Sequence, residues 1–185
     1  QTVEYKDAWM EMFGVPVAYT PYFSHPDPTV KRRTGFLPPH AGASSYFGAM
    51  LQTPFFWDIA PNQDLTLTPL LTSLQGVGVG GDYRFLGMES EIKGKFSGAA
   101  NLYSGAAVNS APEARGHVDM KGRFNLTDTW RWGVDAQRST DDTYTRQYRY
   151  TTPPTLTSRL YAEGFRGRNY MSVNGYAFQG MRAGD

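Results

Sequence analysis

The 185 residues contain no cysteine, which excludes disulfides and thiolate metal sites within them. The sequence also lacks any run of about 18 consecutive apolar residues, the length that a helix needs to span a bilayer. Its longest charge-free stretch, residues 34–57, is interrupted by Pro38, Pro39 and Pro54. A membrane-spanning helix is therefore not expected.

Charge of neither sign prevails, because 18 Lys and Arg against 17 Asp and Glu give a formal net charge of +1. This balance offers no electrostatic reason to expect nucleic-acid binding. His25, His40 and His117 are scattered without metal-ligand spacing. No nucleophile elbow occurs, and the glycines of residues 76–81 alternate along a predicted strand instead of opening a helix. We expect no enzyme, cofactor, metal site or nucleic-acid partner.

Aromatic residues and glycines are abundant. Phe, Trp and Tyr make up 15% of the chain, which also holds 20 Gly, while the mean hydropathy is −0.49. Such a composition is typical of short strands with one apolar and one polar face. A soluble β-sandwich and a membrane β-barrel fit it equally well, so composition predicts an all-β fold and leaves its class open.

Period-two alternation is clearest in residues 77–85 and 91–98. A two-residue loop at Gly87 and Met88 would join them in a type II′ turn, which favours glycine first. Opposite charges then meet on one face and apolar groups on the other. The expected cross-strand pairs are Arg84 with Glu91, Asp82 with Lys93, Tyr83 with Ile92 and Val79 with Phe96.

Three further hairpins follow from the same alternation. Residues 116–126 and 130–137 flank a turn at 127–129 and should place Phe124 opposite Trp132 and Lys121 opposite Asp135. The second hairpin joins 157–166 to 169–179 about Gly167 and Arg168, with mixed faces. The third joins 46–59 to 64–72 about a turn at 60–63.

Two segments depart from this pattern. Residues 103–114 form a predicted loop of small residues, and residues 25–39 hold four prolines around the basic run at 31–33. The proline-rich segment indicates a boundary between an N-terminal unit, residues 1–33, and the strands of residues 34–185. The basic run fits a solvated linker or a contact with phosphate or lipid headgroups. Asp141 and Asp142 are interpreted as turn residues.

The charged face leaves two architectures open. In a soluble sandwich it meets water, whereas in a membrane barrel it lines a wet lumen and the apolar face meets lipid. Successive hairpins with strands of about ten residues favour the barrel. The residues expected to face lipid are Tyr83, Ile92, Phe96, Val118, Phe124, Trp132 and Val134. Those expected to face the lumen are Asp82, Arg84, Glu91, Lys93, Lys95, Lys121, Arg123 and Arg131.

Several longer motifs together resemble one family, the outer-membrane lipopolysaccharide-assembly protein LptD, also called organic-solvent-tolerance protein or OstA. They are GVPV at 14–17, YTPYF at 19–23, PDP at 26–28, KRRTGFLP at 31–38 and FFWDIAPNQDLTLTP at 55–69. The resemblance is dense from about residue 12 to 86 and then fades into a general barrel pattern. The last motif is long and specific.

This resemblance implies that residues 1–33 are the end of a periplasmic β-jellyroll with its linker. Residues 34–185 would then form the first roughly eight strands of a larger antiparallel transmembrane barrel. Because residues 1–5 and 176–178 already have the pattern of strand interiors and no signal peptide opens the chain, we expect an excerpt of a longer protein in the cell outer membrane, with its N-terminal part in the periplasm.

The resemblance also implies a function without catalysis. Family members take lipopolysaccharide from an LptA-like periplasmic bridge, carry an LptE-like plug lipoprotein in the lumen, and release lipopolysaccharide into the outer leaflet among the outer-membrane lipids through a lateral gate. Pro54 and Pro69 match the gate prolines and are expected in the first two barrel strands. Met10 and Met12 are candidates for the lipid path, since flexible Met side chains suit acyl chains. Another outer-membrane pore or receptor, or a soluble carbohydrate-binding β-module, remains the alternative.

Overall fold

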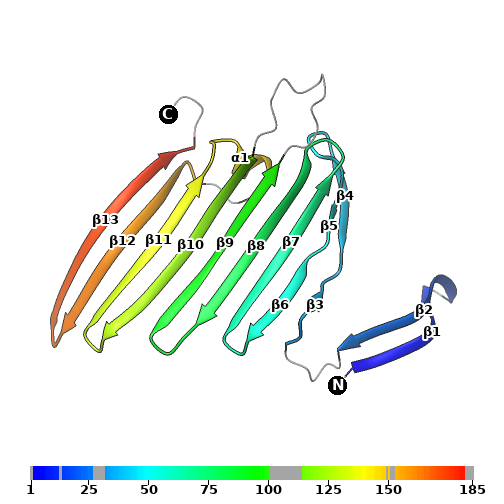
Figure 1. Ribbon diagram of the computed structural model, residues 1–185, viewed down its shortest axis with the longest axis horizontal. Coiled ribbons are helices and arrows are strands. Elements are labelled where there is room, and N and C mark those ends of the chain that lie inside the picture. Colours follow the sequence, from blue (N-terminus) through cyan, green and yellow to red (C-terminus); the bar gives the residue numbers. More distant parts are fainter. Residues whose placement is uncertain are drawn as a thin grey trace. The chain divides into compact units, whose positions relative to one another are not determined.

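The computed structural model describes residues 2–12, 14–26, 32–100, 114–148, 150 and 153–181. Contacts divide the chain into two compact units, Gln1–Thr34 and Gly35–Asp185. The described residues form antiparallel strands and one short helix, α1 (Tyr144–Gln147), which confirms the predicted all-β class (Figure 1). Among these residues, no helix is long and apolar enough to cross a bilayer.

The described residues of the first unit form one hairpin. Strand β1 (Thr2–Met12) pairs antiparallel with β2 (Val15–Pro26). Gly14 in the turn has φ +80°, a left-handed conformation that costs glycine little. Trp9 and Tyr19 lie opposite each other with ring centroids 4.7 Å apart, and both side chains are exposed.

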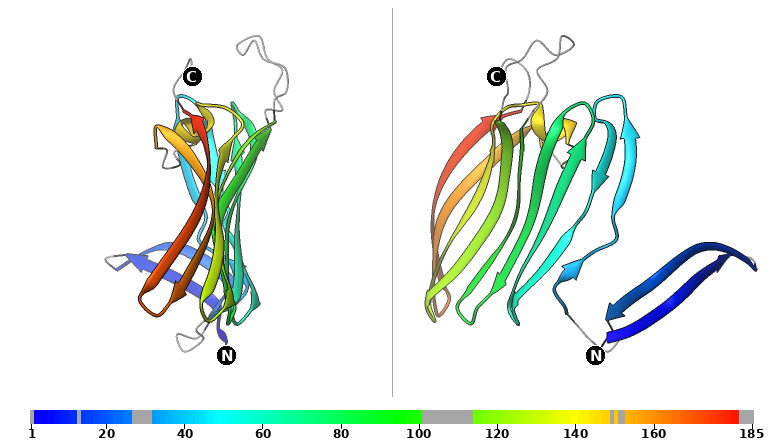
Figure 2. Two further views of the ribbon diagram at one scale, coloured as in Figure 1. Left: turned by 90° about the vertical axis from the view of Figure 1, so that its left-hand side faces the viewer. Right: turned by 45° about the vertical axis from the view of Figure 1, so that its right-hand side comes forward.

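The second unit is one antiparallel sheet of eleven strands in the order β13-β12-β11-β10-β9-β8-β7-β5-β4, with β6 pairing β7 and β3 pairing β6. Figure 2 shows that this sheet is twisted, as extended L-peptide strands are. The strands are β3 (Gly35–Phe36), β4 (His40–Ser44), β5 (Gly48–Gln52), β6 (Phe55–Ala60), β7 (Gln63–Thr72), β8 (Gly76–Leu86), β9 (Ser90–Ala100), β10 (Ala114–Thr127), β11 (Trp130–Ser139), β12 (Thr155–Arg166) and β13 (Asn169–Gly180).

Two of the predicted hairpins are confirmed in register. Phe124 lies opposite Trp132 and Lys121 opposite Asp135 across β10 and β11. Strands β12 and β13 pair up to their Gly167–Arg168 turn, where Arg166 lies opposite Asn169. The predicted loop at 103–114 lies outside the described residues, apart from Ala114, which begins β10.

The predicted register of β8 and β9 is wrong by two residues. Phe85 lies opposite Ile92, so that Arg84 meets Lys93 and Asp82 meets Lys95. The turn is centred one residue later than expected, because the Gly87 amide donates to the Ser90 carbonyl at 2.7 Å and leaves Met88 and Glu89 as the loop. A shift of two residues keeps each side chain on its face, so the division between the faces persists.

The first strands are interrupted. Residues 46–59, predicted as continuous, form β5 and β6, which both pair with β7 and are separated at Thr53 and Pro54. The preceding strands β3 and β4 are likewise separated by residues 37–39, and no period-two signal predicted them. The two interruptions lie side by side, since the Leu37 amide donates to the Pro54 carbonyl at 2.8 Å.

The two ends of the sheet differ. At one end β6–β7, β8–β9, β10–β11 and β12–β13 are joined by short turns (Figure 1). At the opposite end the successive strands are further apart in sequence, since β9 ends at Ala100 and β10 begins at Ala114, while β11 ends at Ser139 and β12 begins at Thr155. The turns at 45–47 and 73–75 are also at this end. Because Gly35 pairs with Phe56 near the turn into β7, the chain enters the sheet at the end with the short turns.

Candidate functional site

One face of the sheet is charged and tied by ion pairs. The register places all eight residues predicted to face a lumen on this face. The ion pairs are Arg84–Asp64 at 2.9 Å, Lys93–Glu91 at 3.0 Å, Arg123–Glu91 at 3.2 Å, Lys95–Asp82 at 3.9 Å and Arg131–Glu163 at 2.5 Å. Most of these cations are well exposed, so the pairs organise a wet surface more than they stabilise the fold.

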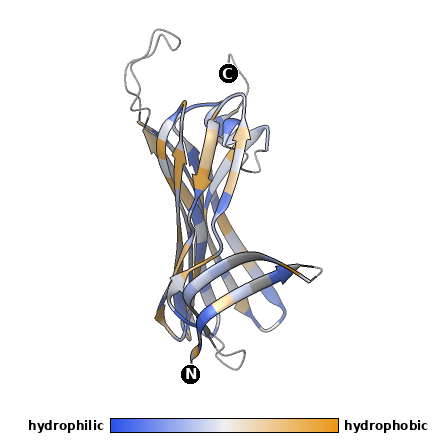
Figure 3. Cartoon of the chain, turned by 90° about the vertical axis from the view of Figure 1, so that its right-hand side faces the viewer, coloured by the Kyte–Doolittle hydropathy of each residue, from blue (hydrophilic) through white to orange (hydrophobic). Residues whose placement is uncertain are grey.

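The other face is apolar. It carries the seven residues predicted to face lipid, together with exposed side chains such as Trp57, Val79 and Leu160. The rings of Phe124 and Trp132 stack at 4.5 Å across β10 and β11. Figure 3 shows hydrophobic and hydrophilic residues alternating along the strands of the sheet. A sheet with one charged face and one exposed apolar face fits the interface between lipid and a wet interior.

The prolines predicted for a gate lie near one edge of the described sheet, but not where they were expected. Pro54 lies in the interruption between β5 and β6, and Pro69 lies in β7 opposite Val79. Because β3 and β4 lie at the edge, β5 and β6, which Pro54 separates, are second from the edge. Strand β7, which contains Pro69, is third. Pro69 still accepts a hydrogen bond from the Thr53 amide at 3.3 Å.

The N-terminal candidates Met10 and Met12 lie in β1, opposite Ala18 and Val15. Their side chains are outside the described residues, so their role in a lipid path stays a prediction.

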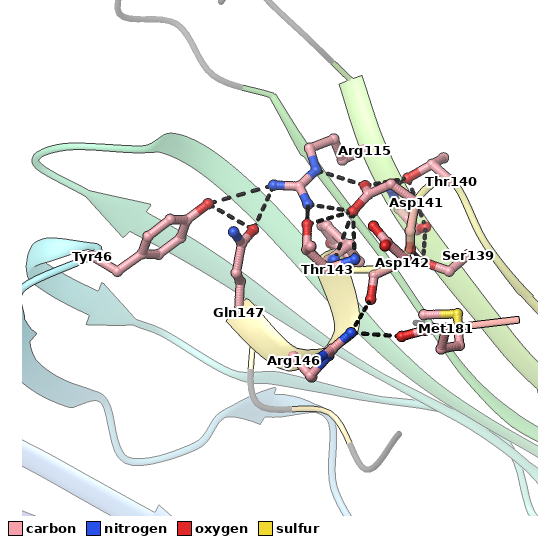
Figure 4. Close-up of polar contacts among 12 residues, drawn as sticks. Tyr46, Arg115, Ser139, Thr140, Asp141, Asp142, Thr143, Arg146, Gln147 and Met181 are labelled. Atoms are coloured by element: carbon pink, nitrogen blue, oxygen red, sulfur yellow. Dashed lines mark hydrogen bonds and ion pairs between the residues drawn. The ribbon is translucent and has the colours of Figure 1, made fainter. Parts of the chain in front are cut away.

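Residues 140–148, here called the strap, leave β11 and fold back over the charged face. The Asp141 carboxylate accepts hydrogen bonds from the backbone amides of Thr143 and Tyr144, at 2.9 and 2.8 Å, and so shapes the start of α1. Arg115 of β10 donates to the same carboxylate at 2.7 and 2.5 Å (Figure 4). The Arg115 guanidinium holds the pKa of Asp141 well below its usual range.

Aromatic packing fixes the strap on the sheet. Tyr144 is fully buried, and its hydroxyl lies 2.8 Å from the Ser97 hydroxyl of β9. Its ring stacks on Tyr148, which in turn contacts Phe47 edge-on at 5.0 Å. Burial raises the pKa of Tyr144 to about 12, so this hydroxyl stays protonated at neutral pH. Tyr144, Thr145 and Phe47 are among the few buried residues of the described part of the second unit.

His117 is hydrogen-bonded on the charged face. Its Nδ1 atom lies 2.7 Å from the Ser97 hydroxyl, and its ring lies 4.1 Å from that of Tyr150. A pocket of about 270 Å³ is lined by Tyr144, Tyr148 and Tyr150 together with sheet residues such as Met50, Gln52 and Thr68. No group of three or more potential metal ligands occurs among the described residues.

No feature of the sequence indicated that the strap would fold onto the sheet. Asp141 was interpreted as a turn residue, which its amide contacts bear out, but its ion pair with Arg115 joins residues 26 positions apart. By composition, five tyrosine and threonine residues in a short polar segment resemble any solvated loop. Only the clustering of Tyr144, Tyr148 and Tyr150, all at even-numbered positions, could have suggested a buried face.

Comparison with known proteins agrees with this architecture. A family model described as LPS transport system D matches residues 113–185. The LPS-assembly protein LptD of Alkalilimnicola ehrlichii is 32% identical over 86% of the chain, that of Paracidovorax citrulli 34% over 89%, and that of Haemophilus influenzae 34% over 76%. The chain spans about a fifth of the length of these relatives (20%, 20% and 18%). Since both the family model and the curated relatives converge on one protein, the chain belongs to the LptD family.

Proposed function

We propose that residues 35–185 form part of the wall of an outer-membrane barrel that delivers lipopolysaccharide to the outer leaflet. The observation that carries this proposal is the division of one sheet into an exposed apolar face and an ion-paired charged face. The apolar face would meet lipid, and the charged face would line a lumen wide enough for hydrated groups. The role is transport, with the chain's own residues supplying walls and not catalysts.

The two ends of the sheet support an orientation. Membrane barrels have short periplasmic turns and longer extracellular loops. The end with the short turns would therefore face the periplasm, and the opposite end, where β9 ends at Ala100 and β11 ends at Ser139, would face the cell surface. Because the chain enters β3 at the end with the short turns, the first unit would lie in the periplasm, as the end of a β-jellyroll should.

A lateral gate beside the first strands is the finer part of the proposal. Pro54 and Pro69 cannot donate backbone hydrogen bonds, and Pro54 coincides with a break in the strand. Each missing bond is worth about 0.5 to 1.5 kcal/mol. Such losses are too small to unfold a barrel, but they lower the cost of separating the first strands from their neighbours.

The same proposal assigns partners by family. An LptA-like bridge would hand lipopolysaccharide to the first unit, and an LptE-like lipoprotein would occupy the lumen against the charged face. Met10 and Met12 of β1 would contact acyl chains. A photo-crosslinker at either position should capture lipopolysaccharide during transport in cells, whereas a crosslinker at exposed Glu4 of the same strand serves as control. Absence of any lipopolysaccharide adduct at Met10 and Met12 would remove this assignment.

The proposal is tested with single cysteines in the full-length parent protein in native membranes. Phe124→Cys and Val134→Cys should react with a lipid-soluble maleimide and resist a hydrophilic one, while Arg123→Cys and Asp135→Cys should react with the hydrophilic reagent. Equal hydrophilic labelling of all four would indicate a sheet in water, as in a soluble carbohydrate-binding module. If the pattern alternates but depletion of the protein leaves surface lipopolysaccharide unchanged, the barrel is a pore or receptor instead.

A further inference from the structure

The strap connects parts of the sheet that do not pair with each other. It begins after β11, yet it contacts Arg115 in β10, Ser97 in β9 and Tyr46 and Phe47 in the turn before β5. In the sheet order, β8 and β7 lie between β9 and β5. The strap therefore crosses the charged face and reaches the turn of the β4–β5 hairpin in the second unit.

Arg115 is the junction of these contacts (Figure 4). Besides its two bonds to Asp141, it donates to the Thr143 hydroxyl at 2.8 Å and to the Gln147 side-chain carbonyl at 2.7 Å. The Tyr46 hydroxyl donates to the same Gln147 oxygen at 2.9 Å. The Arg115 side chain is only 18% exposed, so these charge-assisted bonds are shielded from water and stronger than surface pairs.

The hairpin that the strap reaches is weakly held by its own ladder. Strand β5 pairs with β7 only through Met50, Leu51 and Gln52 before the interruption at Thr53 and Pro54. The turn at 73–75 adds support, because the Ser73 amide donates to the Ala49 carbonyl at 2.9 Å, the Leu74 amide to the Phe47 carbonyl at 3.1 Å and the Gln75 side chain to the Tyr46 carbonyl at 3.3 Å. The side chains of Tyr46 and Phe47 add the contacts with the strap, which tie the β4–β5 turn to strands beyond β7.

We propose that residues 140–148 act as a clamp that fixes the β4–β5 turn to β10 through Arg115, so that the β4–β5 hairpin gains freedom to move when the clamp is released. The clamp itself is independent of what the barrel transports. Its consequence for lipopolysaccharide release rests on the proposed function, because β4 lies at the edge of the described sheet where that function places the gate.

Distances between spin labels in the purified full-length protein test the clamp. One label is placed at exposed Ser45 in the hairpin turn and the other at exposed Arg138 in β11, neither of which takes part in the strap contacts. Two variants break the clamp: Arg115→Met, and the double variant Tyr46→Phe with Gln147→Met, which keeps the Arg115–Asp141 pair. The matched control is Arg131→Met, which removes an ion pair on the same face, with Glu163, away from the strap.

Both clamp variants should broaden the distance distribution and lengthen its mean, while Arg131→Met leaves it unchanged. Should Arg115→Met fail to assemble, the double variant decides alone. An unchanged distribution in the double variant would overturn the clamp. Delivery of lipopolysaccharide to the surface of cells that rely on each variant is measured in parallel. A broadened distribution with normal delivery would retain the clamp and reject the gate at this edge, so the two proposals fail separately.

Discussion

Arg84 lies directly opposite Asp64 on the adjacent strand β7, and its guanidinium donates two hydrogen bonds to that carboxylate, at 2.9 and 3.2 Å. The Asp64 side chain is only 9% exposed, whereas that of Arg84 is 64% exposed. The pair therefore anchors a nearly buried carboxylate with a cation that reaches in from the wet side. Arg84 therefore forms its ion pair with Asp64 of β7, while Glu91 forms ion pairs with Lys93 and Arg123.

Replacing Arg84 should destabilise the barrel more than replacing Lys93. Arg84→Met removes the two hydrogen bonds that Arg84 donates to the nearly buried Asp64 carboxylate, at a cost of about 1 to 3 kcal/mol. Lys93→Met costs less, because Glu91 keeps Arg123 at 3.2 Å. The measurement is the urea midpoint of the full-length protein in detergent, followed by loss of the folded band in heat-modifiability gels. Equal midpoints would contradict the weight given to the Asp64 pair.

Arginine at adjacent positions of β11 should distinguish the two faces. Val134 is on the apolar face, opposite Gly122 and Leu160, whereas Asp135 is on the charged face. Val134→Arg should impair assembly severely, because an arginine in mid-bilayer lipid costs about 2 to 4 kcal/mol. Asp135→Arg should assemble better despite new repulsion with Lys121. The folded fraction in a heat-modifiability gel compares them, and comparable insertion of both variants would refute the assignment of faces.

Two glycines of β9 should respond differently to a methyl group. A Cβ at Gly94 would lie 2.5 Å from the Asp119 carbonyl and 2.5 Å from the Met120 Cα, both backbone atoms of β10. At Gly98 the nearest atom would be 3.8 Å away. Gly94→Ala should therefore push β10 aside and cost about 1 to 3 kcal/mol, while Gly98→Ala should be nearly neutral. Urea unfolding provides the comparison, and a neutral Gly94→Ala would show that β9 and β10 are further apart than described.

Restoring backbone donors at the two prolines should slow transport without blocking assembly. The double variant Pro54→Ala with Pro69→Ala offers new amide donors worth about 0.5 to 1.5 kcal/mol each. Surface lipopolysaccharide should fall and sensitivity to large hydrophobic antibiotics should rise at normal barrel levels. Pro61→Ala, in the turn between β6 and β7, is the control. If the double variant and the control both behave as wild type, the prolines only mark strand irregularities.

The clamp should survive mild acid. Because Arg115 lowers the pKa of Asp141, the stability from this pair is complete above the ordinary Asp pKa of about 3.9 and is lost only as the pH falls through the lower folded value. The distance between labels at Ser45 and Arg138 should therefore be the same at pH 7 and at about pH 5. Broadening already at about pH 5 would show that the carboxylate is not stabilised as its contacts indicate.

Alternation of residue types was enough to predict most strands and both faces. Phe124 and Trp132 pair as expected because each strand of that hairpin has one strongly apolar phase. The predicted register of β8 and β9 is wrong because a charge match between these two strands alone leaves out the third strand, β7. Asp64 on β7 supplies the partner for Arg84, so the charge match with Glu91 was not required.

Other features had no local signal. Strands β3 and β4 are short and contain small residues beside Pro38 and Pro39, so no alternation marks them. The strap depends on contacts such as Tyr46 with Gln147, which are 101 residues apart. Contacts of this kind are decided by the folded sheet and not by sequence periodicity. Pro54 and Pro69 were expected in the first two strands because periodicity did not predict β3 and β4, which lie nearer the edge.

The side-by-side interruptions at residues 37–39 and at Thr53–Pro54 create a crease across the first two strand lines. On the side of the crease nearer the short turns, β3 pairs with β6 and β6 pairs with β7. On the other side, β4 pairs with β5 and β5 pairs with β7. Bending along this line breaks few backbone hydrogen bonds, because a proline nitrogen carries no hydrogen to donate. The edge of the described sheet thus consists of two separate strand pairs, β3–β6 and β4–β5. Among the described residues, the contacts of Arg115 and the strap with this edge are made to the β4–β5 turn.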